Sequence, residues 1–300
     1  MSFITKVKKH MGNYKRQVLN ITVNGIWRDK RQPNGYVERE HILPKEKIKN
    51  VHKKNLLKTY RDECWAYILR EKIKLHPYAH HLNSSQMMCI NFFYPFAVKD
   101  EIKKHLISVI QNHCFEQVII NNPENLKFEF EYESPKDKIK HHRATNFDLR
   151  ISNNNLKLYF EIKYTENAFG KCRDKKDERY ITKYNEKYHD LAEKVIDSKL
   201  VSNDDFYDIF YDNYQIMRNL VHIGKDRYVV FLYHDQNERI ATQATEAKKF
   251  LKEEYQNKLI CLTWDDLYNE TEKELKSVFA ADKNLSVHFE EFSEKYLKFN

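Results

Sequence analysis

The sequence predicts an α/β protein with a mixed β-sheet flanked by helices. Residues 145–163 alternate polar and apolar side chains on either side of three asparagines, which is the pattern of an antiparallel hairpin. Two later runs, 227–233 and 259–263, are continuously apolar, as strands buried on both faces are. Helical patterns separate these two runs from the hairpin and from each other, which is typical of parallel crossover connections.

The segments before the hairpin are mainly helical. Residues 1–50 are polar and irregular, and we expect an arm there. Residues 54–74 carry apolar side chains at amphipathic helical spacing. A second apolar segment, 84–96, begins at two serines, and 100–111 has apolar residues on one helical face. Residues 127–132 alternate and predict a first strand.

The segments after the hairpin predict helices between and beyond the two buried strands. Residues 179–199 form a charged helix in this interpretation. A stronger helix is predicted over 203–222, because Asn203 is suited to cap it and Gly224 to end it. Residues 241–256 are also predicted to be helical, and two further helices finish the chain.

The register of the hairpin follows from its turn. Asn tolerates the positive φ that tight turns need, so Asn154 and Asn155 are predicted as the central turn residues. Apolar residues then face one another across the hairpin: Ile151 and Leu158, Leu149 and Phe160, Phe147 and Ile162.

The same register predicts a metal site. It places Asp148 opposite Glu161, with Lys163 two residues on and on the same face. Facing Cβ atoms lie roughly 5 Å apart, where like charges are unfavourable; at an effective dielectric near 20 the repulsion is about 3 kcal/mol. A divalent cation would turn this repulsion into binding, since Mg²⁺ takes carboxylate oxygens. The alternative interpretation is a solvated polar face with a fortuitous cross-strand pair.

These residues carry a resemblance to a known family. Asp148, a short hairpin and then Glu161-Ile-Lys163 resemble the signature of the PD-(D/E)xK nucleases, with Phe147 in place of the usual Pro. Residues 161–172 and 84–95 are similar to two motifs of a bacterial restriction-endonuclease-like branch, Glu-x-Lys-x-Thr-Glu…Phe-Gly-x-Cys and Ser-Ser-Gln…Asn-x-Phe-x-Pro.

The resemblance covers roughly residues 80–265. It implies a restriction-endonuclease-like fold. We therefore expect a nuclease core with C-terminal helices over residues 81–300, preceded by a basic, partly helical extension over residues 1–80.

The resemblance also implies roles for the hairpin residues. Asp148 and Glu161 would hold Mg²⁺, for which Mn²⁺ can substitute, and the carbonyl of Ile162 would be a further ligand. A metal held in this way activates water and stabilises charge during phosphodiester cleavage. Lys163 would contact the scissile phosphate.

A further acid is expected to complete the site. Glu131 is the best placed on the strand before the hairpin, where Glu129 and Glu133 alternate with it. Glu101, at the start of the preceding helix, is the competing candidate. The alternative for each of these residues is an ordinary exposed glutamate, which is common on strands and at helix starts.

Other polar residues are candidates for binding substrate. Gln215 and Arg218 match a Tyr-Gln-x-x-Arg run of the resembling branch, which implies that they orient substrate or the metal site. Gln86 is a further candidate for such a role. Lys140 and Arg143 belong to a basic run before the hairpin that would contact DNA. A polar helix face or a solvated charge run is the alternative for each.

Composition agrees with a nucleic-acid partner. The chain has 52 Lys and Arg against 44 Asp and Glu, a net charge of +8, with basic residues dense in the first 60 positions. No apolar stretch approaches 18 residues, so we expect no membrane span and a cytoplasmic protein. The resemblance implies that the protein is bacterial. The five cysteines are scattered, which supports neither a disulfide framework nor a zinc site.

The expected function is a Mg²⁺-dependent endonuclease that hydrolyses double-stranded DNA, most simply a type II restriction enzyme. Double-strand cutting with one active site per chain predicts a homodimer. A repair or mobile-element nuclease is the first alternative. A DNA-binding protein that kept the fold and lost activity is the second, and the intact Asp148, Glu161 and Lys163 argue against it.

Overall fold

The computed structural model describes residues 1–33, 35–114, 123–140 and 142–299. The chain forms two compact units. One comprises Met1–Ile102 and Tyr268–Asn300, and the other comprises Lys103–Leu267. The boundary expected at residue 80 falls within the first unit.

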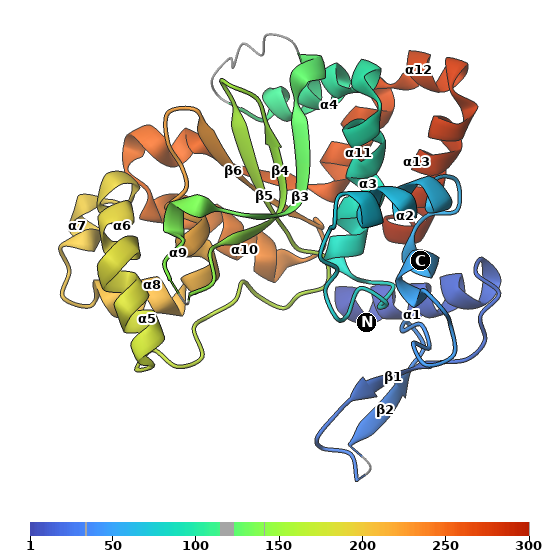
Figure 1. The fold of residues 1–300 in the computed structure, drawn as a ribbon, viewed down its shortest axis with the longest axis horizontal. Coiled ribbons are helices and arrows are strands. Elements are labelled where there is room, and N and C mark those ends of the chain that lie inside the picture. Colours follow the sequence, from blue (N-terminus) through green and yellow to red (C-terminus); the bar gives the residue numbers. More distant parts are fainter. Residues whose placement is uncertain (34, 115–122, 141, 300) are drawn as a thin grey trace. The chain divides into compact units, whose positions relative to one another are not determined.

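The second unit contains a five-stranded mixed sheet (Figure 1). Its spatial order is β3 (Lys127–Glu133), β4 (Asn146–Ser152), β5 (Lys157–Ile162), β6 (Arg227–Tyr233) and β7 (Leu259–Thr263). The first three strands are antiparallel, and β5, β6 and β7 are parallel. The predicted α/β class with a mixed sheet is therefore confirmed, and β6 and β7 have the predicted bounds.

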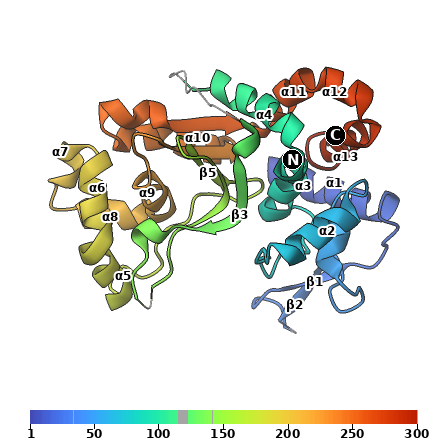
Figure 2. The ribbon, with the colours of Figure 1, turned by 45° about the horizontal axis from the view of Figure 1, so that its top comes forward.

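Helices α5 to α9 lie together along one side of this sheet (Figures 1 and 2). Their core side chains, such as Phe210 and Met217, pack with Tyr159 and Phe231 of the sheet. These elements are α5 (Glu178–Lys183), a π-helical turn (Tyr184–Tyr188), α6 (His189–Val195), α7 (Ser198–Val201), α8 (Phe206–Asp212) and α9 (Tyr214–Leu220). Helix α10 (Glu238–Glu246) joins the same layer and contacts β6 and β7.

The opposite face of the sheet is covered by α4 (Asp100–Asn112). Ile107 and Ile110 of this helix lie against Leu158 and Tyr228 around a small apolar void. The predicted placement of helices on both faces of the sheet is therefore confirmed within this unit.

Four predicted helices have clearly different bounds. The helix expected over 54–74 is shorter and spans only α2 (Arg61–Arg70). The helix expected over 203–222 breaks at Asn213, whose backbone leaves the helical region (φ −115°, ψ 32°) while its Nδ2 donates to the carbonyl of Ile209. The helix expected over 179–199 contains the π-helical turn. The one expected over 241–256 ends at Glu246 and continues as short 3-10 turns. In the described residues, three helices follow β7, where two were expected.

The first unit is more ordered than the expected N-terminal arm. It begins with α1 (Phe3–Gln17), in which Ser2 accepts a capping bond from the amide of Thr5 and Val7, Met11 and Tyr14 are buried. These three residues recur at spacings of four and three, a helical period that the surrounding lysines obscured. The prediction of an irregular arm over residues 1–50 is therefore wrong.

The rest of the first unit is a short ribbon and a set of helices. The ribbon pairs β1 (Gly25–Arg28) with β2 (Tyr36–Arg39). The helices are α2 (Arg61–Arg70), α3 (Ser85–Val98), α11 (Trp264–Glu274), α12 (Lys276–Ala281) and α13 (Lys283–Tyr296). Helix α3 is almost entirely buried and packs on α13, where the ring of Phe92 lies 5.1 Å from that of Phe292. Across the described part of the chain, no helix is long and apolar enough to cross a membrane.

Candidate functional site

Strands β4 and β5 form the predicted hairpin. Leu149 pairs with Phe160 and Ile151 pairs with Leu158, which is the predicted register. The side chain of Asn153 closes the turn by accepting hydrogen bonds from two following backbone amides.

The predicted alternation of β4 is interrupted at Asp148. The ring of Phe147 lies 4.8 Å from that of Tyr159, on the face of the sheet that α6 to α10 cover. Leu149 pairs with Phe160, whose side chain points to the other face because successive strand residues alternate. Phe147 and Leu149 therefore point to opposite faces, and the predicted facing of Phe147 with Ile162 is wrong.

The interruption positions the Asp148 carboxylate at the end of β5. The amide of Ile162 donates to Asp148 Oδ2 at 2.6 Å. Beside it in β3, Glu131 adopts a left-handed backbone with φ +53°. That conformation costs a non-glycine residue about 1–2 kcal/mol, and such strain gathers at functional sites.

Three carboxylates crowd this point. Asp148 is partly exposed, yet desolvation raises the pKa of its carboxyl well above the ordinary value, and Glu161 and then Glu131 raise it further. Glu129, in contrast, is bound by Arg150, and Glu133 is exposed. Of the three acids on β3, Glu131 is the one among the main charges that raise the pKa of Asp148.

Glu161 is buried and receives three hydrogen bonds. Lys163 Nζ and Gln215 Nε2 donate to its Oε1 at 2.7 and 2.6 Å, and Asn219 Nδ2 donates to its Oε2 at 2.9 Å. Charge-assisted donors of this kind stabilise a buried carboxylate in one orientation. Sequence reasoning missed Asn219; its spacing of four from Gln215, one turn along α9, was the available signal.

The backbone after β5 is tied to α9. The amide of Gly170 donates to Gln215 Oε1 at 2.7 Å, and the amide of Gln215 donates to the Gly170 carbonyl at 2.9 Å. A Cβ atom at Gly170 would lie 3.3 Å from Gln215 Oε1, so a larger residue would press on this contact. Gln215 therefore connects Glu161 to the segment that follows Lys163.

Lys163 is buried and remains cationic. Burial lowers the pKa of its ammonium, but the carboxylates of Glu161, Glu166 and Asp148 together raise the pKa above its ordinary value. Arg218 on α9 follows the same rule: burial lowers the pKa of its guanidinium and Glu161 raises it, with a net increase. Two cations therefore act on Glu161.

The oxygen atoms at this site fit a hard cation. Asn219 Oδ1 and Asn146 Oδ1 are buried acceptors that receive no hydrogen bond from the described residues. Their amide groups bond to Glu161 and Glu131, respectively. Carboxylate, amide and carbonyl oxygens are the ligands that Mg²⁺ accepts. Asp148, Glu161 and the Ile162 carbonyl could hold such an ion, with water in its other positions.

The closest groups of potential metal ligands lie elsewhere. In the described ranges, two sets of three His, Asp or Glu ligand atoms come within 4.8 Å of one another, and neither contains Asp148 or Glu161. These sets are His189, Asp190 and Glu193, and His234, Asp235 and Asp265. At the hairpin, the candidate ligands are instead the carboxylates of Asp148 and Glu161 and neutral oxygens, with the Glu131 carboxylate nearby.

Comparison with known proteins adds a family. A family model described as Restriction Endonuclease associating with ARP matches residues 8–297. The chain belongs to this family. No curated protein and no solved structure matches it. Membership supports a nuclease role, and the match extends through the first unit, which the resemblance of residues 80–265 left out.

Two of the predicted site residues, Gln86 and Glu101, lie in the first unit. Gln86 is buried, where its Oε1 accepts from the amide of His76 and its Nε2 donates to the Lys74 carbonyl. Those bonds brace the turn before α3. Glu101 lies in the first turn of α4, also within the first unit.

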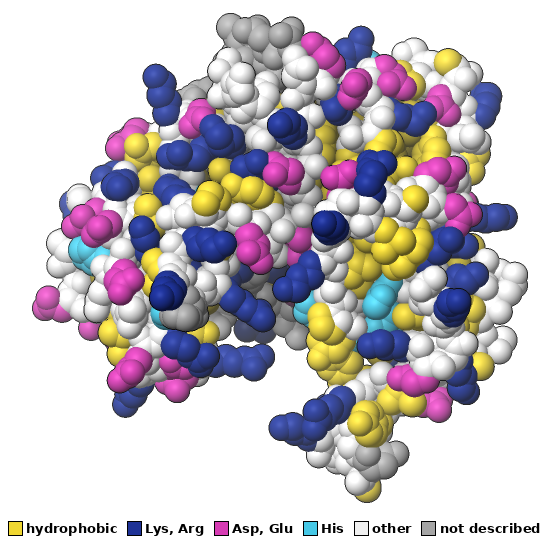
Figure 3. All heavy atoms as spheres, in the orientation of Figure 1, with side chains coloured by type: hydrophobic (Ala, Val, Ile, Leu, Met, Phe, Trp, Pro, Cys, Tyr) yellow, Lys and Arg dark blue, Asp and Glu magenta, His cyan; other side chains and the backbone are white. Residues whose placement is uncertain are grey.

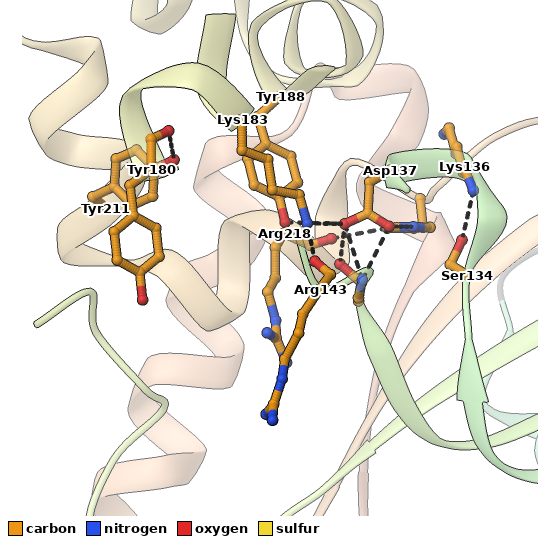
Figure 4. Close-up of polar contacts among 11 residues, drawn as sticks. Ser134, Lys136, Asp137, Arg143, Tyr180, Lys183, Tyr188, Tyr211 and Arg218 are labelled. Carbon is orange, nitrogen blue, oxygen red and sulfur yellow. Dashed lines mark hydrogen bonds and ion pairs between the residues drawn. The ribbon is translucent and has the colours of Figure 1, made fainter. Parts of the chain in front are cut away.

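Lys140 and Arg143 are exposed on the segment between β3 and β4. A buried carboxylate, Asp137, anchors this segment (Figure 4). It accepts hydrogen bonds from Thr145, Lys183 and Tyr188. Lys183 also donates to the Arg143 carbonyl. Figure 4 shows the Arg143 and Arg218 side chains pointing in the same direction, away from Asp137.

The charge of Asp137 is stabilised by its neighbours. Burial raises the pKa of this carboxyl, but the contacts with His222, Lys183 and Thr145 outweigh burial and hold the pKa well below its usual range. In this protein the buried network around Asp137 connects β3, β4 and α5 through side chains that lie far apart in sequence. Sequence reasoning had no periodic signal for it.

We expect Asp137→Asn to destabilise the protein by about 3 kcal/mol, because it leaves the buried Lys183 ammonium without its counter-ion. Wild-type stability from this carboxylate is present above its unfolded pKa of about 3.9 and is lost as the pH falls. The variant should lack that acid-side loss. Urea unfolding between pH 3 and 7 measures both effects.

Asp212→Asn is the matched control, since Asp212 pairs with Lys175 at the surface and such pairs contribute at most about 1 kcal/mol. An Asp137→Asn loss as small as that of the control would contradict the anchoring role.

Proposed function

We propose that this protein is a Mg²⁺-dependent endonuclease that hydrolyses double-stranded DNA, with the β4–β5 hairpin as a PD-(D/E)xK active site. The observation that carries the proposal is the contact of the Lys163 ammonium with Glu161, next to Asp148, in a chain of the restriction endonuclease family. We infer a type II restriction enzyme that acts as a homodimer.

The bound cation, Mg²⁺ or Mn²⁺, would lower the pKa of a coordinated water and neutralise charge on the phosphate. Asp148 and Glu161 would hold it, with the Ile162 carbonyl as a third protein ligand. Gln215 and Asn219 fix the orientation of the Glu161 carboxylate through their hydrogen bonds. Each of these residues is positioned by an element of the second unit, so the site is preorganised.

Lys163 provides a point charge beside the expected position of the scissile phosphate. Its burial strengthens the interaction of this charge with the phosphate, because electrostatic interactions become stronger as the effective dielectric falls. Arg143 and Lys140, on the segment that Asp137 anchors, would contact the DNA backbone nearby. Arg218 is better suited to balance Glu161, since it is largely enclosed and Glu161 is the main charge that raises its pKa.

Digestion of supercoiled plasmid tests this function. We expect linear DNA with uniform sequenced ends in Mg²⁺ or Mn²⁺, and no cleavage in Ca²⁺ or EDTA. Nicks without a common sequence would favour a repair or mobile-element nuclease. DNA binding without cleavage in any of these ions would favour an inactive binding protein.

A further inference from the structure

The positive charge of the chain is concentrated at its N-terminus. The first 50 residues contain twelve Lys or Arg and four Asp or Glu, a net charge of +8 that equals the net charge of all 300 residues. The remaining 250 residues are therefore balanced. Charge that is concentrated in one segment of the chain, rather than spread over the whole sequence, is the electrostatic footprint of nucleic-acid binding.

Part of this charge lies on the β1–β2 ribbon, which projects from the body of the first unit (Figure 1). The pairs Ile26–Glu38 and Arg28–Tyr36 place four side chains on one face. All four are exposed, Ile26 by 49% and Tyr36 by 53%. Figure 3 shows basic, acidic and apolar side chains together at this ribbon.

The other face of the ribbon fixes it to the body. The Trp27 ring lies 5.1 Å from that of Tyr78 and 5.4 Å from that of His81. At the base, the amide of Gly25 donates to the carbonyl of Ile42, and a Cβ atom at Gly25 would come within 2.4 Å of the Ile42 side chain. One face of the ribbon is therefore anchored to the body of the first unit, and the other face is presented to solvent.

A hollow of about 640 Å³ adjoins the ribbon. Its lining includes Lys8 and Lys9 of α1, Arg39 of β2 and the Trp27 ring, together with the acids Glu38 and Glu40. Lys8 and Lys9 are exposed, and burial together with Arg39 lowers the pKa of Lys8. The three cations Lys8, Lys9 and Arg39 outnumber the two acids, and an anionic ligand would neutralise the positive charge that remains.

We propose that the first unit docks on double-stranded DNA, with the β1–β2 ribbon in the major groove and Lys8 and Lys9 on the flanking phosphates. This inference rests on the proposed function and adds the element that selects the sequence. The major groove admits a two-stranded ribbon. Strands of four residues are about 13 Å long. The major groove is about 8.5 Å deep, so the ribbon is long enough to reach the base edges.

The composition of the presented face matches base edges better than it matches phosphates. Arg28 can donate to guanine, Glu38 can accept from the amino group of cytosine, and Ile26 can contact a thymine methyl group. A surface that contacted only phosphates would gain nothing from Glu38 or Ile26, because both the acid and the exposed apolar side chain would oppose it. Lys8 and Lys9, in contrast, provide charge alone.

The phosphate contacts are tested by binding of a fluorescent 30-base-pair random duplex pool in Ca²⁺ at several KCl concentrations. Removing two phosphate contacts makes the negative slope of log K against log salt less steep by about 1.8. We expect this change for Lys8→Ala/Lys9→Ala. The control is Lys273→Ala/Lys276→Ala, exposed lysines of α11 and α12 in the same unit, which should leave the slope unchanged.

The base contacts are tested by selection from the same pool. The wild type should enrich a motif, Lys8→Ala/Lys9→Ala should enrich the same motif, and Arg28→Ala/Glu38→Ala should lose base preference at the contacted positions. Equal melting temperatures exclude misfolding of these surface variants. A wild type that cleaves plasmid and enriches a motif, with unchanged slope and motif in both variants, overturns this inference alone. A wild type that neither binds nor cleaves DNA overturns the proposed function as well.

Discussion

Asp148→Asn and Glu161→Gln should each lower Mg²⁺-dependent DNA cleavage at least about 1,000-fold, because losing the metal removes several kcal/mol of transition-state stabilisation and each 1.36 kcal/mol is tenfold in rate. Both substitutions keep the size of the side chain, so neither creates a cavity. Single-turnover cleavage of a plasmid in Mg²⁺ measures the effect.

The two variants should differ in stability without metal. Asp148→Asn removes one of three crowded carboxylates, so its melting temperature should equal or exceed that of the wild type. The raised pKa of Asp148 means that the metal-free wild type loses stability as the pH rises above about 3.9, and this loss should be absent in the variant. Glu161→Gln should be less stable, because it leaves the buried Lys163 ammonium without its partner.

Glu133→Gln is the matched control, since Glu133 is exposed on β3 two residues from Glu131. It should keep wild-type cleavage. Near-normal cleavage by Asp148→Asn or Glu161→Gln, with wild-type melting, would refute the assignment of the active site to this hairpin.

Lys163→Ala should bind DNA almost normally in Ca²⁺ yet cut at least about 100-fold more slowly in Mg²⁺, the scale typical of losing one electrostatic stabiliser. The physical reason is that charge on the phosphate grows in the transition state, so a point charge there affects the rate more than affinity. Lys163→Arg should restore little activity, because a planar guanidinium cannot replace a compact ammonium in this buried position.

Lys157→Ala provides the control for this prediction. Lys157 begins the same strand and forms an ion pair with Asp226. Its removal should leave the cleavage rate unchanged. If Lys163→Ala lost affinity in proportion to rate, Lys163 would be an ordinary phosphate contact, and loss of neither would remove it from the active site.

Much of the second unit could be predicted because its signals are local. A strand buried on both faces is apolar throughout, and β6 and β7 have the bounds that this pattern predicts. The turn asparagines determine the register of the hairpin. The sequence alone could therefore predict that Asp148, Glu161 and Lys163 lie close together.

Other features depend on contacts between distant segments. Nothing in the local pattern of β3 or β4 indicates that Glu131 is left-handed or that Phe147 turns to the opposite face, because neighbouring strands impose both. The helix around Asn213 breaks although its apolar stripe continues.

The sequence by itself determined the class of the fold, the hairpin and the residues that carry its charge, since periodicity and turn chemistry act between near neighbours. The tertiary structure alone decided which side chains surround that charge. Asn219 reaches Glu161 from α9, and Lys183 reaches Asp137 from α5, across 58 and 46 residues of chain. Burial makes such contacts strong, and burial is a property of the folded chain rather than of any segment within it.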